Sequence, residues 1–151
     1  MHINRSNLVV VTEIIFGTLF LVIGCAIYLL FRSKTLNIYR WCSLIGISDY
    51  VDSVRFQVQN LNIPPFVKFS LPDGLYCAAY ILIIDAIWHN ENGIIKNIII
   101  SLVPIITISS ELLQYFGLVE GTFDAYDLIC YSIPIFIFVL IIIYIKSKSH
   151  I

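Results

Sequence analysis

The residues best suited to chemistry lie in a polar stretch between two strongly apolar segments. Glu111 and Gln114 stand one helical turn apart at the end of the first segment, and Asp124 and Asp127 stand one turn apart at the start of the second. Ionisable side chains where a chain leaves and re-enters a membrane are costly and often functional. Clustered carboxylates recruit cations, and hard oxygen ligands suit Mg²⁺ or Ca²⁺. Such a cation would in turn meet a phosphate.

The composition of the chain indicates an integral membrane protein. The chain has 151 residues, of which 59% are hydrophobic and 13% are charged, whereas soluble domains average about 45–50% apolar and about 25% charged residues. We therefore predict a single integral membrane domain over residues 1–151. The net charge of -1 provides no basic field for nucleic acid. The four cysteines form no C-x-x-C pair, so they indicate neither a zinc site nor a redox motif.

The apolar pattern predicts an all-α, polytopic fold. A helix needs about 20 apolar residues to span a bilayer, and four segments approach that length: residues 8–31, 71–88, 94–116 and 123–145. Ser70 is the predicted N-cap of the second segment and Thr122 that of the fourth. The four spans leave one long connection, residues 32–69, which we expect to be an amphipathic helical segment.

That connection has two alternative interpretations. Apolar residues recur in it at near-helical spacing, and Trp41 and Tyr50 would anchor it among lipid headgroups. Alternatively, it is an ordinary helix packed on the bundle. In both cases Arg55 and Lys68 are the basic residues placed to fold back onto the carboxylates.

Four spans place residues 32–69 and 117–122 on the same side of the membrane. Asp73, at the start of the second span, therefore joins the acidic stretch. Asp73 and Asp124 would also serve as helix caps, because a carboxylate complements the dipole in the first turn. Glu111, at a helix C-terminus, and Asp127, deeper in the fourth span, are not explained by capping. The residues expected to line this mouth are Tyr76, Tyr80 and Tyr131.

A second polar group is predicted at the opposite face. It consists of Glu13 in the first span, with Asp85 and His89 near the end of the second. Asp85 and His89 are four residues apart, so they would pair with each other, or Asp85 would pair with Lys96. The structural interpretation is an ion pair, and the functional one is a proton or cation site.

The acidic stretch resembles the VanZ-like family of small bacterial membrane proteins. The similarity rests on Glu111-x-x-Gln114, on Gly121-Thr122-Phe123-Asp124-x-x-Asp127, and on the entry Ser70-Leu71-Pro72-Asp73-Gly74-Leu75-Tyr76. This chain has Gly121 where members often carry arginine, and Tyr131 where asparagine is often found. The resemblance implies a polytopic protein of the bacterial cell envelope, and it implies no settled biochemical activity.

Three functions remain open at this level. The acidic mouth would bind a lipid-linked phosphate headgroup through Mg²⁺ or Ca²⁺, the partner being a membrane lipid or a lipid-linked envelope precursor. Alternatively, the acidic motif packs the third and fourth helices in a non-catalytic module or accessory subunit. Proton or cation passage would require a homo-oligomer. No nucleophile stands in a recognisable arrangement, so catalysis is undecided. Lys146 and Lys148 favour an inner-membrane orientation with both termini cytoplasmic.

Overall fold

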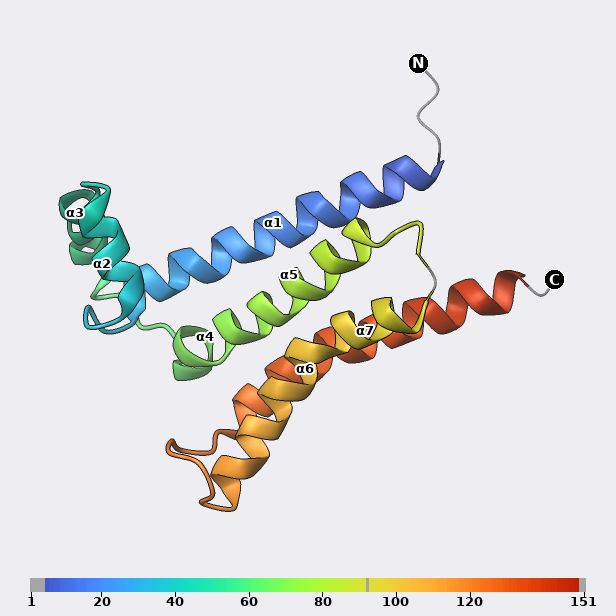
Figure 1. The fold of residues 1–151 in the computed structure, drawn as a ribbon. Helices are drawn as coiled ribbons and strands as arrows, with labels where there is room; N and C mark the ends of the chain where they lie inside the picture. The colour runs from blue at the N-terminus through green and yellow to red at the C-terminus, as the bar shows by residue number, and fades with distance from the viewer. Residues whose placement is uncertain (1–4, 92, 150–151) are drawn as a thin grey trace.

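Seven helices account for most of the computed structural model (Figure 1). The structure describes residues 5–91 and 93–149, and it describes side chains over residues 7–91 and 93–143. No strand occurs in these ranges, which confirms the predicted all-α class. The helices are α1 (Arg5–Phe31), α2 (Asn37–Leu44), α3 (Ser48–Val58), α4 (Pro65–Phe69), α5 (Leu71–Ile87), α6 (Ile94–Tyr115) and α7 (Ala125–Ser149).

Three of these helices are long and apolar enough to cross a membrane. The qualifying stretches are Asn7–Phe31 in α1, Ile94–Tyr115 in α6 and Ala125–Ile143 in α7. α5 has 17 residues, which at about 1.5 Å per residue is roughly 25 Å of helix, less than a hydrocarbon core of about 30 Å. The membrane character is thus supported by three helices, and the fourth span stays a prediction.

α5 lies between α1 and the α6–α7 pair (Figure 1), and small residues make this close packing possible. A Cβ on Gly74 of α5 would stand 2.7 Å from the carbonyl oxygen of Cys130 on α7. A Cβ on Gly17 of α1 would stand 2.7 Å from the side chain of Ile83. Glycine at these positions therefore lets the neighbouring helices approach more closely than any larger residue would allow.

The connection is helical, but it is three short helices rather than one. The prediction of a continuous amphipathic helix is wrong because Gly46, at φ 76°, ends α2 and turns the chain into α3. Trp41 and Tyr50 are 64% and 74% exposed, as headgroup anchors would be. Tyr39 of α2 is buried in a cluster with Val51 of α3 and Leu29 of α1, and its burial raises the pKa of its hydroxyl.

Arg55 fixes the connection to the end of α1. Its guanidinium donates to the backbone oxygen of Leu29 at 3.0 Å and to that of Arg32 at 2.6 Å, and it also bonds the hydroxyl of Tyr39. These carbonyls belong to the last turn of α1 or follow it, where helical partners run out. Arg55 is thereby committed to the backbone, and the prediction that it pairs with the acidic mouth is wrong.

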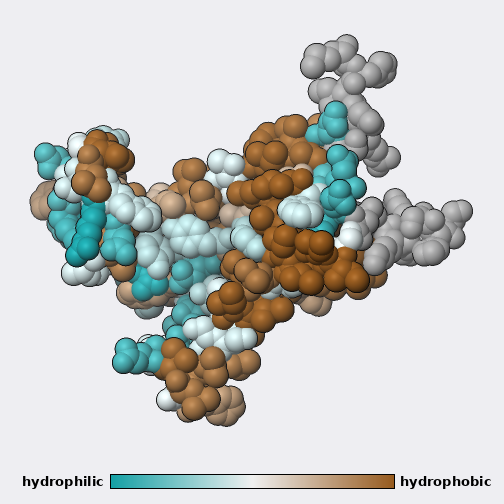
Figure 2. All heavy atoms as spheres, viewed as in Figure 1, coloured by the Kyte–Doolittle hydropathy of each residue, from teal (hydrophilic) through white to brown (hydrophobic). Residues whose placement is uncertain are grey.

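Hydrophilic and hydrophobic residues separate along the molecule. Figure 2 shows hydrophilic residues gathered over α2, α3 and α4, and hydrophobic residues over the long helices toward the opposite end. The turn between α6 and α7 is an exception, because its exposed residues include Phe116, Leu118 and Val119. Apolar residues exposed on this scale are typical of surfaces that face lipid.

Candidate site at the connection end of the helices

The acidic residues predicted to share one face lie where α5 and α7 begin and α6 ends, beside the connection. Arg32 at the end of α1 pairs with Asp73 of α5, and Asp127 of α7 and Glu111 of α6 are near enough for their charges to act on Asp73. This is the grouping that the parity of the spans predicts. We call Arg32, Asp73 and Asp127 the connection-end site.

Arg32 is the basic partner of this site, and the prediction of Lys68 in that role is wrong. Its Nη2 lies 3.5 Å from Oδ2 of Asp73 and donates to the backbone oxygen of Phe69 at 2.9 Å. The guanidinium also stands 5.0 Å from the ring centroids of Tyr28 and Phe69, within cation–π range. Lys68 instead lies over the ring of Phe31.

Asp73 consequently has a different role from the one expected. It lies in the first turn of α5, but no side chain caps that helix at Ser70. α4 runs directly into α5, so Ser70 has helical dihedral angles (φ -97°, ψ -37°), and its buried hydroxyl has no partner among the described residues. The predicted N-cap at Ser70 is wrong, and Asp73 serves the ion pair with Arg32.

Asp127 is nearer the helix start than the sequence predicts. α7 begins at Ala125, so Asp127 lies in its first turn, where a carboxylate complements the helix dipole. Its Oδ1 is nevertheless buried without a hydrogen-bond partner among the described residues. Nε of Arg32 is a buried donor in the same condition. An unsatisfied buried polar atom costs about 1–3 kcal/mol, so both atoms call for a partner outside the described protein atoms.

Glu111 and Asp124 join α6 to α7. Glu111 is 6% exposed, and its Oε2 accepts the backbone N–H of Asp124 at 3.3 Å. Asp124 in turn caps α7, because its Oδ1 accepts the N–H of Tyr126 at 2.8 Å. The prediction of Asp124 as a cap is therefore confirmed, and that of Thr122 as the N-cap is wrong.

Gln114 belongs to the same hairpin. Its amide lies against Gly121, so closely that a Cβ there would stand 2.7 Å from the amide carbon. Gly121 has φ 139°, a conformation that larger residues rarely adopt. Gln114 also donates to the Ser110 hydroxyl at 3.5 Å. These contacts give Glu111, Gln114 and Asp124 structural roles in the turn.

The three tyrosines expected to line the acidic mouth have different surroundings in the structure. Tyr131 packs, as Tyr80 does, against the buried cluster of Cys77, Ile81 and Ile100, and its role as a lining residue stays a prediction. The ring of Tyr76 packs on Tyr28 at 5.8 Å, and its hydroxyl reaches Sγ of Cys25 at 3.5 Å. Tyr80 lies deeper and donates to the backbone oxygen of Ile99, so its prediction as a lining residue is wrong.

The ligands expected for Mg²⁺ or Ca²⁺ do not converge on one point. Within residues 7–91 and 93–143, no three His, Cys, Asp or Glu side chains are arranged to hold a metal ion. Glu111 and Asp124 face the backbone of the hairpin, and Asp73 faces Arg32. Among the described residues, Oδ1 of Asp127 is the carboxylate oxygen of this site that is buried without a hydrogen-bond partner.

The opposite polar group also forms. Nζ of Lys96 lies 2.6 Å from Oδ1 of Asp85, so of the two pairings left open for Asp85 the structure selects Lys96. Glu13 of α1 lies beside Asp85, and its buried Oε2 has no partner among the described residues. His89 is half-buried in the turn after α5. Asp85 is 12 residues after Asp73 on α5, so this group lies roughly 18 Å along the helix from the connection-end site.

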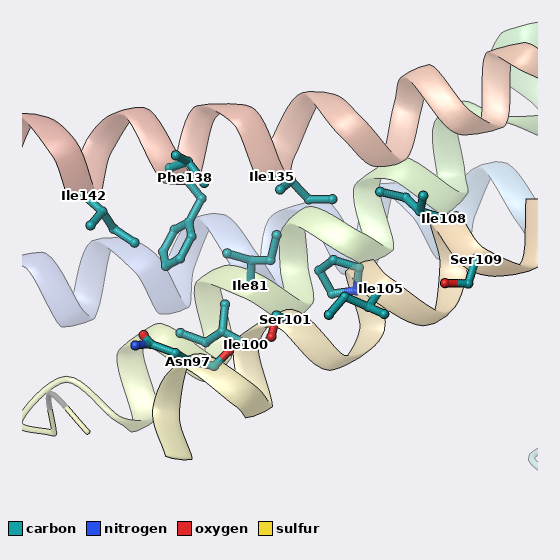
Figure 3. Close-up of a pocket in the computed structure, with 12 residues that line it drawn as sticks. Ile81, Asn97, Ile100, Ser101, Ile105, Ile108, Ser109, Ile135, Phe138 and Ile142 are labelled. Atoms are coloured by element: carbon teal, nitrogen blue, oxygen red, sulfur yellow. Dashed lines mark hydrogen bonds between the residues drawn. The ribbon is translucent and has the colours of Figure 1, made fainter. Parts of the chain in front are cut away.

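An apolar cavity of about 380 Å³ lies between α6 and α7, with Ile81 of α5 at its floor (Figure 3). Ile100, Ile135 and Phe138 point into it from the surrounding helices. The hydroxyl of Ser101 donates to the backbone oxygen of Asn97 at 2.7 Å, within its own helix. The cavity therefore offers a surface for hydrocarbon rather than for a polar reaction.

Arg32 and Tyr28 are the site residues that the sequence analysis missed. Arg32 is the first basic residue after the apolar run of α1, which placed it at the correct end of the bundle. Tyr28, one turn earlier, shares its face. Comparison with protein-family models, with curated proteins and with solved structures gives no match for this chain.

Proposed function

We propose that this protein is a polytopic membrane protein of the cell envelope that binds a lipid-linked phosphate headgroup at the connection-end site. The observation that carries the proposal is the pair of buried atoms without partners, Nε of Arg32 and Oδ1 of Asp127. The first is a donor suited to a phosphate oxygen, and the second is an acceptor suited to a hydroxyl or an ammonium.

The charges around the site favour a headgroup with both kinds of group. Arg32 is the basic residue of the site and pairs with Asp73, and the charges of Asp127 and Glu111 also act on Asp73. A bare phosphate would meet an excess of negative charge there. A phosphodiester with a neighbouring hydroxyl or ammonium would give Arg32 an anion and Asp127 a donor, and that donor would take the role that the sequence analysis assigned to a divalent cation.

The membrane topology belongs to the same proposal. α5 would be the fourth span, since it packs between α1 and α7 along its length, and the short helix would be accommodated by local thinning of the bilayer. Both termini would be cytoplasmic in a bacterial inner membrane, with the connection-end site outside. This orientation rests on Lys146 and Lys148, which lie outside the residues whose side chains are described. The resemblance to VanZ-like proteins agrees with an envelope role.

Binding of short-chain lipids in detergent tests the proposal. We expect dihexanoyl phosphatidylglycerol or dihexanoyl phosphatidylethanolamine to bind saturably, and Arg32→Gln and Asp127→Asn each to weaken the affinity at least tenfold. Asp52→Asn is the matched control, because Asp52 pairs with Lys34 on the exposed connection at 2.6 Å. Binding that is unchanged in Arg32→Gln and Asp127→Asn, with both variants folded, would reject the proposal.

A second function is favoured by the α6–α7 hairpin. The bond from the Asp124 N–H to Glu111 and the cap at Tyr126 make the acidic motif a lock between two helices. A non-catalytic membrane module would need only this lock. The two functions differ at Asp127, which takes no part in these hairpin bonds. If Asp127→Asn leaves lipid binding intact while Glu111→Ala destabilises the protein, the module is the better account.

A further inference from the structure

A groove runs along α5 between α1 and α7, on the side away from α6. Two neighbouring cavities, of about 310 and 210 Å³, form it. They share four lining residues, namely Phe20 of α1, Ala78 of α5, and Pro134 and Ile137 of α7. Cavities with four residues in common are neighbouring parts of one depression in the surface.

The groove is apolar over almost its whole length. Its polar side chains, Thr12 and Glu13, come from α1 at the end far from the connection. The hydroxyl of Thr12 donates to the backbone oxygen of Leu8 at 2.8 Å, which leaves the wall without an unpaired hydroxyl there. Apart from the far end, where Oε2 of Glu13 is buried without a partner among the described residues, this surface suits a hydrocarbon chain.

The length of the groove matches one leaflet of a bilayer. Its lining on α7 runs from Cys130 to Ile141, which is roughly 16 Å of helix at about 1.5 Å per residue. The hydrocarbon core of a bilayer is about 30 Å thick, so one leaflet contributes about 15 Å. The groove is therefore about as long as the part of an acyl chain that lies in one leaflet.

The groove begins beside the connection-end site. Gly74, which lines its near end, follows Asp73 directly, and Cys130 stands one turn after Asp127. We propose that the groove holds one hydrocarbon chain of the lipid whose phosphate headgroup occupies the connection-end site. This inference rests on the proposed function, and it makes the ligand a membrane lipid rather than free phosphate or a soluble phosphate ester.

The cavity of Figure 3 is the competing position for the chain. It is lined by α6 in place of α1. Ile108 lines this cavity, and Glu111 lies one helical turn after it. The carboxylate of Glu111 already accepts the N–H of Asp124. A chain there would approach the hairpin lock instead of Arg32 and Asp127. The two positions can be separated by filling each of them in turn.

Retention of dioleoyl phosphatidylglycerol in detergent, measured by native mass spectrometry, tests the inference. Ala78→Phe fills the groove from α5. Ile137→Trp narrows it from α7 at a side chain that is 51% exposed, where folding has room for the larger ring. Ala26→Phe, on the exposed face of α1, and Ile105→Trp, in the cavity of Figure 3, are the controls.

We expect the wild type and both controls to retain one lipid, and Ala78→Phe and Ile137→Trp to lower retention at least tenfold. Full retention by the folded groove variants overturns the inference. Loss in Ile105→Trp alone overturns it in favour of the other cavity. A lipid-free dimer that Ile137→Trp dissociates overturns it in favour of a second copy of the chain.

Two further arms separate this inference from the proposed function. If dioleoylglycerol, which lacks phosphate, is retained as well as the phospholipid and Asp127→Asn has no effect, the groove is supported and the headgroup site fails. Suppose instead that sn-glycerol 3-phosphate binds the wild type and Ala78→Phe equally, and that the phospholipid binds no more tightly than sn-glycerol 3-phosphate. The headgroup site is then supported and the groove fails.

Discussion

Replacing Glu111 by alanine should destabilise the hairpin between α6 and α7. The variant removes the acceptor of the Asp124 N–H and leaves a buried gap, because Glu111 is 6% exposed. Hydrogen bonds to charged groups contribute about 1.5–3 kcal/mol. The distance of 3.3 Å is long for such a bond, so we expect about 1.5 kcal/mol, which is a fall of about 3–6 °C in the melting temperature.

Thermal unfolding in detergent, followed by circular dichroism, measures this loss. Glu111→Gln keeps a carbonyl oxygen in the same place, so it should lose less than half as much as Glu111→Ala. Glu120→Ala, in the exposed part of the same turn, is the control and should melt with the wild type. If Glu111→Ala also melts with the wild type, or if Glu111→Gln falls as far as Glu111→Ala, the hydrogen bond is not the source of the stability.

Three other changes test contacts in separate parts of the molecule, namely the α5–α7 packing, the opposite polar group and the connection. Gly74→Leu should lower the unfolding free energy by about 1–3 kcal/mol, because its side chain would meet the backbone of Cys130; an unchanged melting temperature would contradict the close approach. Lys96→Met should cost about 2 kcal/mol by leaving Asp85 unpaired, and adding Asp85→Asn should recover part of it. Arg55→Gln should speed amide exchange throughout α2 and α3 but not in α7, and uniform exchange would refute its anchoring role.

The helices were predictable because apolar length and turn residues are local signals. The apolar runs set α1, α6 and α7 to within a few residues, and Pro72 marked the start of α5. The caps were less predictable. Ser70 fails as a cap because α4 continues into α5 without an extended residue between them. The end of α2 at Gly46 was not predictable, because the residues on both sides of it keep a helical hydrophobic spacing. That spacing gives no sign of a positive φ.

The sequence predicted which acidic residues share one end of the helices, and it did not predict the partners of their side chains. The predicted parity of the spans only places Asp73 and Asp127 on the same side of the membrane, and the packing of α5 against α7 brings them near each other. Arg32 rather than Arg55 is the basic partner of Asp73 because of where the end of α1 meets α4, which is a tertiary contact. The commitment of Glu111 to the hairpin likewise depends on the 3.3 Å bond to the Asp124 backbone, and no sequence spacing fixes such a bond.

The most direct test of the headgroup site is the side-chain ¹⁵N–¹H resonance of Nε in Arg32, observed while dihexanoyl phosphatidylglycerol is added to the protein in detergent. This N–H is buried without a partner in the described protein, so a phosphate at the site would become its acceptor. We predict a saturable downfield shift of the proton, absent from the Arg55 resonance and much weakened in Asp127→Asn. An Arg32 resonance that stays fixed up to saturating lipid would contradict the central claim.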